Sequence, residues 1–236
     1  MNSFVKRLLG VLAVLGCMVS SGNSQTQSQI AVPKIEQPAI QGFLAAAGAN
    51  DTDKLNSGLT SGVPVDSADA SGRTALLIAT RANAIEAARV LIEAGADVNA
   101  KDRQHDSPYL YAGAEGHLEI LKMTVEAGAD LGAVNRYGGT ALIPAAHHGH
   151  PDVVRYLLTT ETDIDHVNFL GWTALLEAVI LGDGGPVYQE IVDLLLKAGA
   201  DASIGDKEGV TALDHARSRG QAEIVQLLKK SEAKRN

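Results

Sequence analysis

The sequence predicts an all-α solenoid, a stack of helix-turn-helix units, and a strict internal period carries this prediction. Hydroxyl residues recur every 33 residues at Thr74, Ser107, Thr140 and Thr173, and Thr211 follows 38 residues after the last of them. Alanines five positions further along keep the same spacing. A period of this length is typical of repeat proteins in which each unit is one supersecondary motif.

Each period contains two segments with the pattern of a helix. The first begins at the hydroxyl residue, as in TALLIA, SPYLYA, TALIPA, TALLEA and TALDHA. Its hydroxyl oxygen can accept hydrogen bonds from free N–H groups, so we expect a helix N-cap there, and Pro108 suits a first turn. The second segment has apolar residues at helical spacing, as in EIVDLLLKAG.

A polar turn follows each second helix. Glycine usually ends that helix, where a left-handed residue is favoured. In the fourth unit Glu161 occupies this position, which predicts that Glu161→Gly stabilises the protein. Aspartates recur in phase just after it, so we assign them to the scaffold and not to acid–base chemistry. They are Asp97, Asp130, Asp163 and Asp201.

Helix, turn, helix and projecting turn over 33 residues resemble the ankyrin repeat family. SPYL and the TAL series stand for the family's T-P-L-H, EGH (115–117) and HGH (148–150) for its G-H, and GADVNAKD for its hairpin entry. The resemblance covers residues 37–236 and implies about six units with short β-turn fingers. The expected units are 37–69, 70–102, 103–135, 136–168, 169–206 and 207–236.

Several features depart from the family pattern. The histidine after T-P-L is replaced in every unit, by Leu77, Leu110, Ile143, Leu176 and Asp214. The first unit lacks most motifs and the last ends in KKSEAKRN, as expected of capping units with a polar outer side. The fifth unit has five extra residues within ILGDGGPVYQE, where we expect a longer turn between its helices. This stretch is no P-loop, because no Gly-Lys-Ser/Thr follows.

The N-terminal segment 1–21 has the layout of a signal peptide. Lys6 and Arg7 precede an apolar run, Leu8–Val19, and small polar residues follow it. This run is too short to span a bilayer, although an N-terminal membrane anchor or a frayed helix is the alternative. Residues 22–36 are polar and predict a flexible linker.

Cys17, the single cysteine, lies in AVLGC, which resembles a bacterial lipobox. Two alternatives follow: lipidation at Cys17, or ordinary cleavage after a small residue such as Ser21 or Ser24. Either route predicts an exported protein, periplasmic or lipid-anchored in the bacterial envelope. A repeat domain without cysteine suits an oxidising compartment.

Composition and the placement of reactive residues argue against several functions. A net charge of −8 disfavours nucleic acid as a partner, and membrane contact is expected only through the N-terminal anchor. The repeat domain has no thiol nucleophile, and its periodic hydroxyls are explained as caps, so an enzyme of unrecognised type is the least favoured alternative. No cofactor is expected.

Histidines provide the other alternative, a metal-binding protein of the periplasm. His147, His148 and His150 lie together, with His105 and His117 one unit away. Adjacent His147 and His148 cannot share a helix face, and His117 and His150 occupy the G-H position, where a structural hydrogen bond explains them. The spacing of three or four convergent ligands is missing, so no metal site is expected.

The stretch NFLGWT (168–173) sets large apolar residues on a turn. Partners of the family usually contact the turn tips and first helices, at positions that the stacking leaves free. We therefore predict a non-catalytic, monomeric module that binds a protein partner through a concave apolar patch rimmed by arginine and histidine. The alternative is that Phe169 and Trp172 fold over the turn against the fourth or sixth unit. The predicted site residues are Arg136, Tyr137, His147, His148, Phe169, Leu170, Trp172, Ile180 and Leu181.

Overall fold

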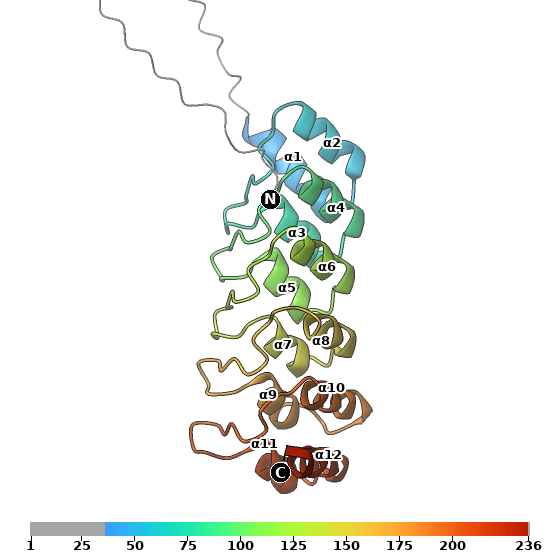
Figure 1. Cartoon of the computed structure of the whole chain (residues 1–236). Helices are drawn as coiled ribbons and strands as arrows, with labels where there is room; N and C mark the ends of the chain where they lie inside the picture. The colour runs from blue at the N-terminus through green and yellow to red at the C-terminus, as the bar shows by residue number, and fades with distance from the viewer. Residues whose placement is uncertain (1–35, 236) are drawn as a thin grey trace, which may run out of the picture. The chain divides into compact units, whose positions relative to one another are not determined.

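The computed structural model describes residues 36–235, which form six successive pairs of α-helices (Figure 1). The first helices are α1 (Gln37–Gly48), α3 (Ala75–Arg81), α5 (Pro108–Ala114), α7 (Leu142–His147), α9 (Ala174–Ile180) and α11 (Ala212–Ser218). The second helices are α2 (Thr52–Thr60), α4 (Ile85–Glu93), α6 (Leu118–Glu126), α8 (Pro151–Leu157), α10 (Pro186–Lys197) and α12 (Ala222–Arg235). The predicted signal peptide, Cys17 and nearly all of the predicted linker lie outside the described residues.

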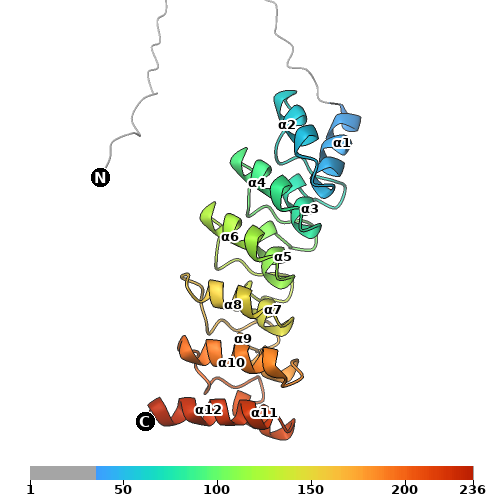
Figure 2. The same cartoon turned by 90° about the vertical axis from the view of Figure 1, so that its right-hand side faces the viewer.

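The pairs stack in chain order to give two layers. Each first helix packs on the first helix of the next pair, and each second helix packs on the next second helix (Figures 1 and 2). Turns between the pairs project along one edge, the left side of Figure 1, and are called fingers below. Apart from two isolated bridges, the part of the chain from 36 to 235 contains no β-structure. The predicted all-α solenoid is confirmed.

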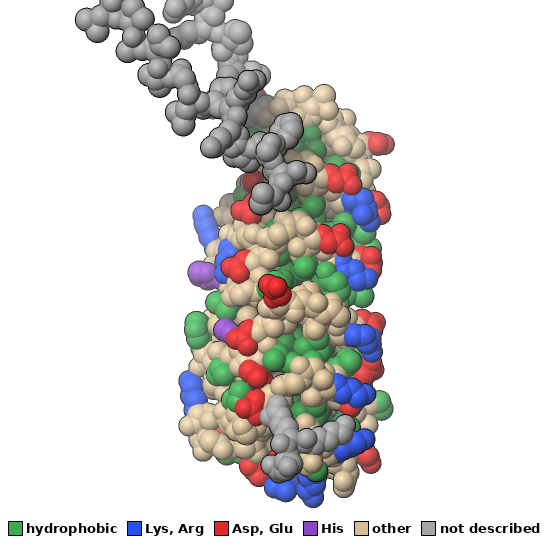
Figure 3. All heavy atoms as spheres, viewed as in Figure 1, with side chains coloured by type: hydrophobic (Ala, Val, Ile, Leu, Met, Phe, Trp, Pro, Cys, Tyr) green, Lys and Arg blue, Asp and Glu red, His purple; other side chains and the backbone are tan. Residues whose placement is uncertain are grey.

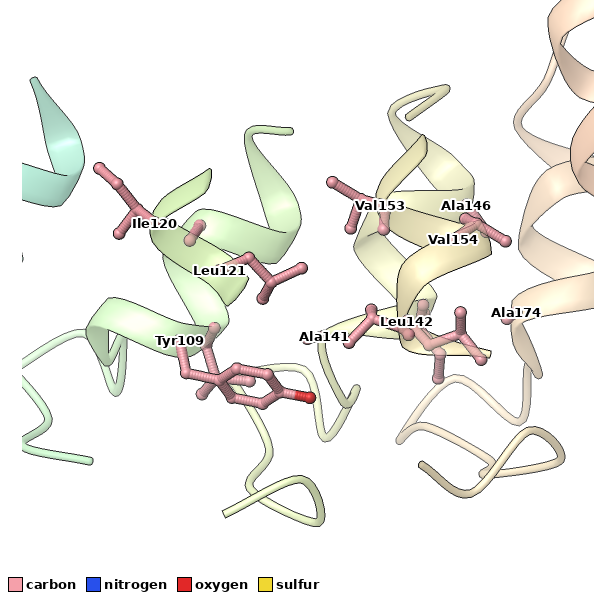
Figure 4. Packing of buried hydrophobic residues seen from close by; sticks show 14 of the residues in the cluster. Tyr109, Ile120, Leu121, Ala141, Leu142, Ala146, Val153, Val154 and Ala174 are labelled. Carbon is pink, nitrogen blue, oxygen red and sulfur yellow. The ribbon is translucent and has the colours of Figure 1, made fainter. Parts of the chain in front are cut away.

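Small and aliphatic side chains fill the space between neighbouring pairs. In Figure 4, Leu121 and Tyr109 of one pair point towards Ala141, Leu142 and the helices of the next. Alanines on the first helices let the backbones approach closely, and the leucine, isoleucine and valine side chains of the second helices remove apolar surface from water. The low aromatic content of the chain follows from this close packing.

Hydroxyl caps start four of the first helices, as the period predicts. Thr74, Ser107 and Thr173 each accept a hydrogen bond from the N–H three residues on, at 3.2 Å. Thr211 caps α11 in the same way, and the Asp214 carboxylate accepts from the backbone N–H of Thr211 to complete a capping box. The residue that replaces the family's histidine in the last unit thus stabilises the helix start.

Thr140 does not act as the predicted cap. Its hydroxyl is buried without a hydrogen-bond partner, and Ala141 is the N-cap of α7. The N–H of Ile143 bonds to the backbone carbonyl of Thr140 instead, at 3.2 Å. Because Pro144 has no N–H, the first turn of α7 has one N–H group fewer that needs an acceptor than the other first helices.

The periodic aspartates belong to the scaffold, as predicted. Each carboxylate accepts a hydrogen bond from the N–H two residues on, at 2.8–3.1 Å, which fixes the turn after the second helix. Asp66 and Asp165 then accept the N–H groups of Asp97 and Asp201 in the following unit, which ties neighbouring turns together.

The five extra residues of the fifth unit do not all lie in the turn. Helix α10 has 12 residues where α6 has 9, so three of them lengthen the second helix. The remaining two lengthen the connection between α9 and α10. This connection is fixed to its neighbours, because Tyr188 donates to the His147 carbonyl and Gln221 donates to the Gly182 carbonyl.

Glu161 does not have the conformation that the period predicted. Glycines at the in-phase positions have positive φ, whereas Glu161 does not. Helix α8 ends early, at Leu157, and the hydroxyls of Thr159 and Thr160 donate to the carbonyls of Tyr156 and Leu157. Since these hydroxyls satisfy the last carbonyls, no left-handed residue is required. The prediction that Glu161→Gly is stabilising therefore rests on a wrong premise.

His105, and not Glu161, is a side chain that occupies a glycine position with positive φ. Its φ is +64°, at the finger position where Gly72, Gly138, Gly171 and Gly209 have φ between +75° and +88°. A side chain there is unfavourable, so His105→Gly should stabilise the protein by about 0.5–1 kcal/mol. Urea denaturation of the two variants checks this: Glu161→Gly, the control, should gain nothing. Equal gains in both would contradict this assignment of strain.

Candidate binding groove

A side-chain oxygen closes each finger, and this arrangement answers why NFLGWT forms a turn. Asn168 Oδ1 accepts the N–H groups of Leu170 and Trp172, at 2.9 and 3.0 Å, while its own N–H bonds to the Trp172 carbonyl. Gly171 supplies the positive φ that the tight turn requires. The residues that close the fingers in this way are Asp69, Asp102, Asn135, Asn168 and Asp206.

A groove of about 490 Å³ lies between the fingers and the first helices of the second to fifth units. Ile143 and Pro144 of α7 form part of its wall, and the fingers supply the opposite side. Charged and histidine side chains line it together with apolar ones. The full lining is Arg81, Gln104, Asp106, Tyr111, Ala114, Glu115, Asn135, Arg136, Tyr137, Gly139, Ile143, Pro144, His147, His148, Asn168, Leu170, Glu177 and Leu181.

Six of the nine predicted site residues line this groove. They are Arg136, Tyr137, His147, His148, Leu170 and Leu181. Among them Tyr137, Leu170 and Leu181 are exposed, with 55%, 49% and 41% of their surface accessible. An exposed apolar surface of this kind, beside arginine and histidine, is typical of a contact area.

Three predicted residues lie elsewhere. Trp172 and Ile180 are half-buried and pack against the hydrophobic core, which removes part of their apolar surface from water. Phe169 is 68% exposed but lies outside the groove. Its ring covers Gly138 of the preceding finger, because a Cβ at Gly138 would lie 2.5 Å from Phe169 Cδ1. The alternative of packing against the fourth unit therefore applies to Phe169.

The sequence reasoning missed Glu177 and Tyr111 as groove residues. Both occupy the fifth position of the TAL motif, which the period assigns to the helix core. The available signal was the residue type, since a carboxyl group in TALLEA is out of character for a core position. Arg81 and Asp106 also line the groove and were not predicted as part of the site.

Two arginines share one carboxylate at the N-terminal end of the groove. Asp106 Oδ2 lies 3.9 Å from Arg81 Nη1 and 3.5 Å from Arg136 Nη1. The guanidinium of Arg81 stacks on Tyr111 at 4.4 Å, and that of Arg136 on Tyr137 at 4.9 Å. Burial raises the pKa of Asp106, and the positive charges of Arg136 and Arg81 oppose that rise. Each of these arginines therefore already lies near the Asp106 carboxylate and stacks on a tyrosine ring.

Glu177 is a buried carboxyl group in the wall of the groove, with 6% of the residue exposed. Oε1 accepts a hydrogen bond from Asn168 Nδ2 at 2.7 Å, and Oε2 lies 3.5 Å from His147 Nδ1. Burial raises the pKa of Glu177 from 4.5 to about 7, and the bond from Asn168 opposes the rise. Burial also lowers the pKa of His147, with the charge of His148 as a second cause.

The histidines mainly bond to backbone carbonyls of neighbouring units. His117 Nδ1 lies 2.9 Å from the Thr80 carbonyl oxygen, which confirms the structural hydrogen bond expected at this G-H position. His148 Nδ1 lies 2.6 Å from the Ala114 carbonyl oxygen, and the His150 ring packs over Gly116. Over residues 36–235, no group of three or more His, Cys, Asp or Glu side chains is arranged to hold a metal ion.

The two edges of the stack differ in surface character. Along the left-hand edge of Figure 3, where the fingers project, hydrophobic, histidine and basic side chains lie close together. Along the right-hand edge, over the second helices, acidic and basic side chains alternate and hydrophobic ones are sparse. Ion pairs such as Lys122–Glu119 and Arg155–Glu190 account for part of this second surface. The finger side is therefore the more suitable contact surface.

Stacked helical pairs, hydroxyl caps and oxygen-closed fingers define a helical-repeat protein with a groove along its finger side. A family model described as ankyrin repeats (3 copies) matches residues 43–135 and 109–206. The chain belongs to the ankyrin repeat family, which generally provides protein–protein interaction modules. The family that the sequence motifs indicated is thereby confirmed.

Individual relatives agree with this assignment. The chain is 54% identical over 52 residues, 22% of its length, to the Escherichia coli (strain K12) ankyrin repeat protein YahD, and the match spans 26% of that relative. It is 56% identical to an ankyrin repeat domain from Acinetobacter baumannii AYE, whose crystal structure superposes with a TM-score of 0.78 over 80% of this chain and 97% of that one. A second crystal structure, of the ankyrin repeat protein EF0377, is 46% identical with a TM-score of 0.78, covering 83% and 98% of the two chains.

Between residues 36 and 235, every helix is too short or too polar to cross a lipid bilayer.

Glu177 should make stability depend on pH. The unfolded chain releases this proton near pH 4.5 and the folded protein near pH 7. The folded state thus binds more protons between these values, and the stability that Glu177 contributes falls as the pH rises through this window. Because glutamine stays neutral, Glu177→Gln should gain about 2–3 kcal/mol relative to the wild type between pH 4.5 and pH 8.

Urea denaturation across this pH range measures the difference. Glu115→Gln controls for the loss of one negative charge, because Glu115 is exposed on the same groove. Parallel pH profiles for wild type and Glu177→Gln would show that the Glu177 carboxyl group is not buried as described.

Proposed function

We propose that this protein is a non-catalytic module that binds a protein partner through the groove. The observation that carries the proposal is the exposed apolar surface of Tyr137, Leu170 and Leu181 beside the arginines and histidines of the groove. Such a surface is costly to leave in water and is a common core of protein contacts. The general role of the ankyrin repeat family supports the same assignment.

The chemistry of the groove also favours binding over catalysis. No serine, threonine or cysteine is among the residues that line it, and its histidines lie next to a backbone carbonyl or next to a carboxyl group with a raised pKa. A nucleophile held by a base, which hydrolytic chemistry would need, is not found among the residues that line the groove. We therefore assign the groove to recognition.

We also propose that the protein acts in the bacterial envelope, exported by its N-terminal segment and anchored through a lipid on Cys17. The support lies in the sequence alone: two basic residues, an apolar run of twelve and the lipobox-like AVLGC. A rigid repeat domain on a polar tether would then engage one envelope protein, supporting or inhibiting it.

Truncating the apolar surface should weaken partner binding. In the double variant Tyr137→Ala/Leu170→Ala, loss of two anchors should weaken binding by about 2 kcal/mol or more, roughly 30-fold. The measurement is crosslinking and capture from bacterial envelope extract, followed by quantitative mass spectrometry of the recovered proteins.

Val187→Ala provides the matched control, since Val187 is an exposed apolar residue outside the groove. A partner must be recovered with the wild type and the control and lost with the double variant. Recovery of the same proteins with all three chains would place the contact surface elsewhere.

The anchor proposal has its own test. Cys17→Ser removes the thiol that a lipid would modify, so the protein should move from the membrane fraction to the soluble periplasmic fraction. Fractionation of cells that express either chain, with detection by immunoblot, measures the shift. A wild-type chain that is already soluble would contradict lipidation at Cys17.

A further inference from the structure

Glu177 is a residue that the stacking of repeats does not require. The in-phase positions of the other units hold Ile78, Tyr111, Pro144 and His215. Apolar and aromatic side chains serve the scaffold at three of these positions, whereas His215, like Glu177, bonds to the residue that closes the finger, here Asp206 at 2.7 Å. A buried carboxyl group costs folding energy unless something compensates its charge. Its presence in a groove wall indicates a role in recognition.

One oxygen of Glu177 remains without a strong partner. Oε1 is held by Asn168, whereas the one ion-pair partner of Oε2 within residues 36–235 is His147 Nδ1 at 3.5 Å, which is too long for a full hydrogen bond. Burial keeps the imidazole of His147 neutral at neutral pH, so it does not cancel a carboxylate charge. Within residues 36–235, no lysine or arginine nitrogen lies within 4.0 Å of Glu177.

The two arginines of the groove share one carboxylate, Asp106, and a second carboxylate, Glu115, lies exposed on the same groove. Arg81 and Arg136 lie on either side of Asp106 and stack on tyrosine rings. An incoming anion would have to approach Asp106 to reach them. Because Asp106 and Glu115 balance the two arginines, ionisation of Glu177 above neutral pH gives the groove a net negative charge.

We propose that the groove binds a segment of its partner that carries a lysine or arginine side chain, whose cationic head pairs with Glu177 Oε2. The aliphatic stem of that side chain fits the apolar wall of Ile143, Leu170 and Leu181, since long cationic side chains lay their methylenes along apolar surface. The inference rests on the proposed function and specifies the chemistry of the partner.

The test uses small probes and needs no partner. Butylguanidinium chloride is titrated into the purified full chain, labelled with ¹³C at isoleucine and leucine methyl groups, at pH 8. Butyrate, with a similar alkyl stem and the opposite charge, is titrated in parallel, and sodium chloride controls for ionic strength. The methyl signals of Ile143, Leu170 and Leu181 report on the groove.

Butylguanidinium should shift these signals saturably in the wild type and in Glu115→Gln. In Glu177→Gln, a chain expected to be at least as stable, the affinity should fall at least fivefold. Butyrate that shifts these signals as strongly as butylguanidinium, or unchanged butylguanidinium binding by Glu177→Gln, would overturn the proposal. The two proposals fail distinguishably. A partner that is recovered from envelope extract while Glu177→Gln leaves butylguanidinium binding unchanged rejects only the cationic recognition. A groove that binds the cation while envelope extract yields no partner rejects the protein-binding function and leaves only a cation site.

Discussion

Each finger of this array depends on a single side-chain oxygen. An aspartate or asparagine at the finger base accepts two backbone N–H groups, two and four residues further on, and its own N–H bonds to the carbonyl four residues on. A buried donor without a partner costs about 1–3 kcal/mol, so one oxygen decides whether the turn holds its shape. The fingers form one side of the groove, so the shape of the groove depends on these oxygens.

The choice between aspartate and asparagine at this position has electrostatic consequences. Asp102 and Asp206 close the fingers that lead into the third and sixth units, and Asp206 Oδ2 also pairs with His215 at 2.7 Å. In the finger that leads into the fifth unit the residue is Asn168, whose Nδ2 donates to Glu177 while its Oδ1 holds the finger. An aspartate there would set a second carboxylate against Glu177. The neutral amide thus allows one side chain to stabilise the finger and a buried carboxyl group together.

The period of 33 was sufficient to predict the helices, most caps and the family, because stacking repeats the same local requirement in every unit. It could not show which way a side chain points at a position the stacking leaves free. Asp106 and Trp172 are in phase, yet the carboxylate faces the groove and the indole packs against the core. Glu177 was missed for the opposite reason. The period assigns its position to the helix core, so a groove residue was not expected there. Thr140 and Glu161 show that neighbouring residues, Pro144 and the threonines at the end of α8, can satisfy a helix end in another way.

The account requires that the Asn168 side chain holds the finger on which the groove depends. Hydrogen exchange of the Leu170 and Trp172 amides in Asn168→Ala tests this most directly. Both amides should exchange much faster than in the wild type, while those of Tyr137 and Gly139, held by Asn135, keep their protection. Unchanged protection of Leu170 and Trp172 would contradict the claim that this oxygen shapes the finger and the groove beside it.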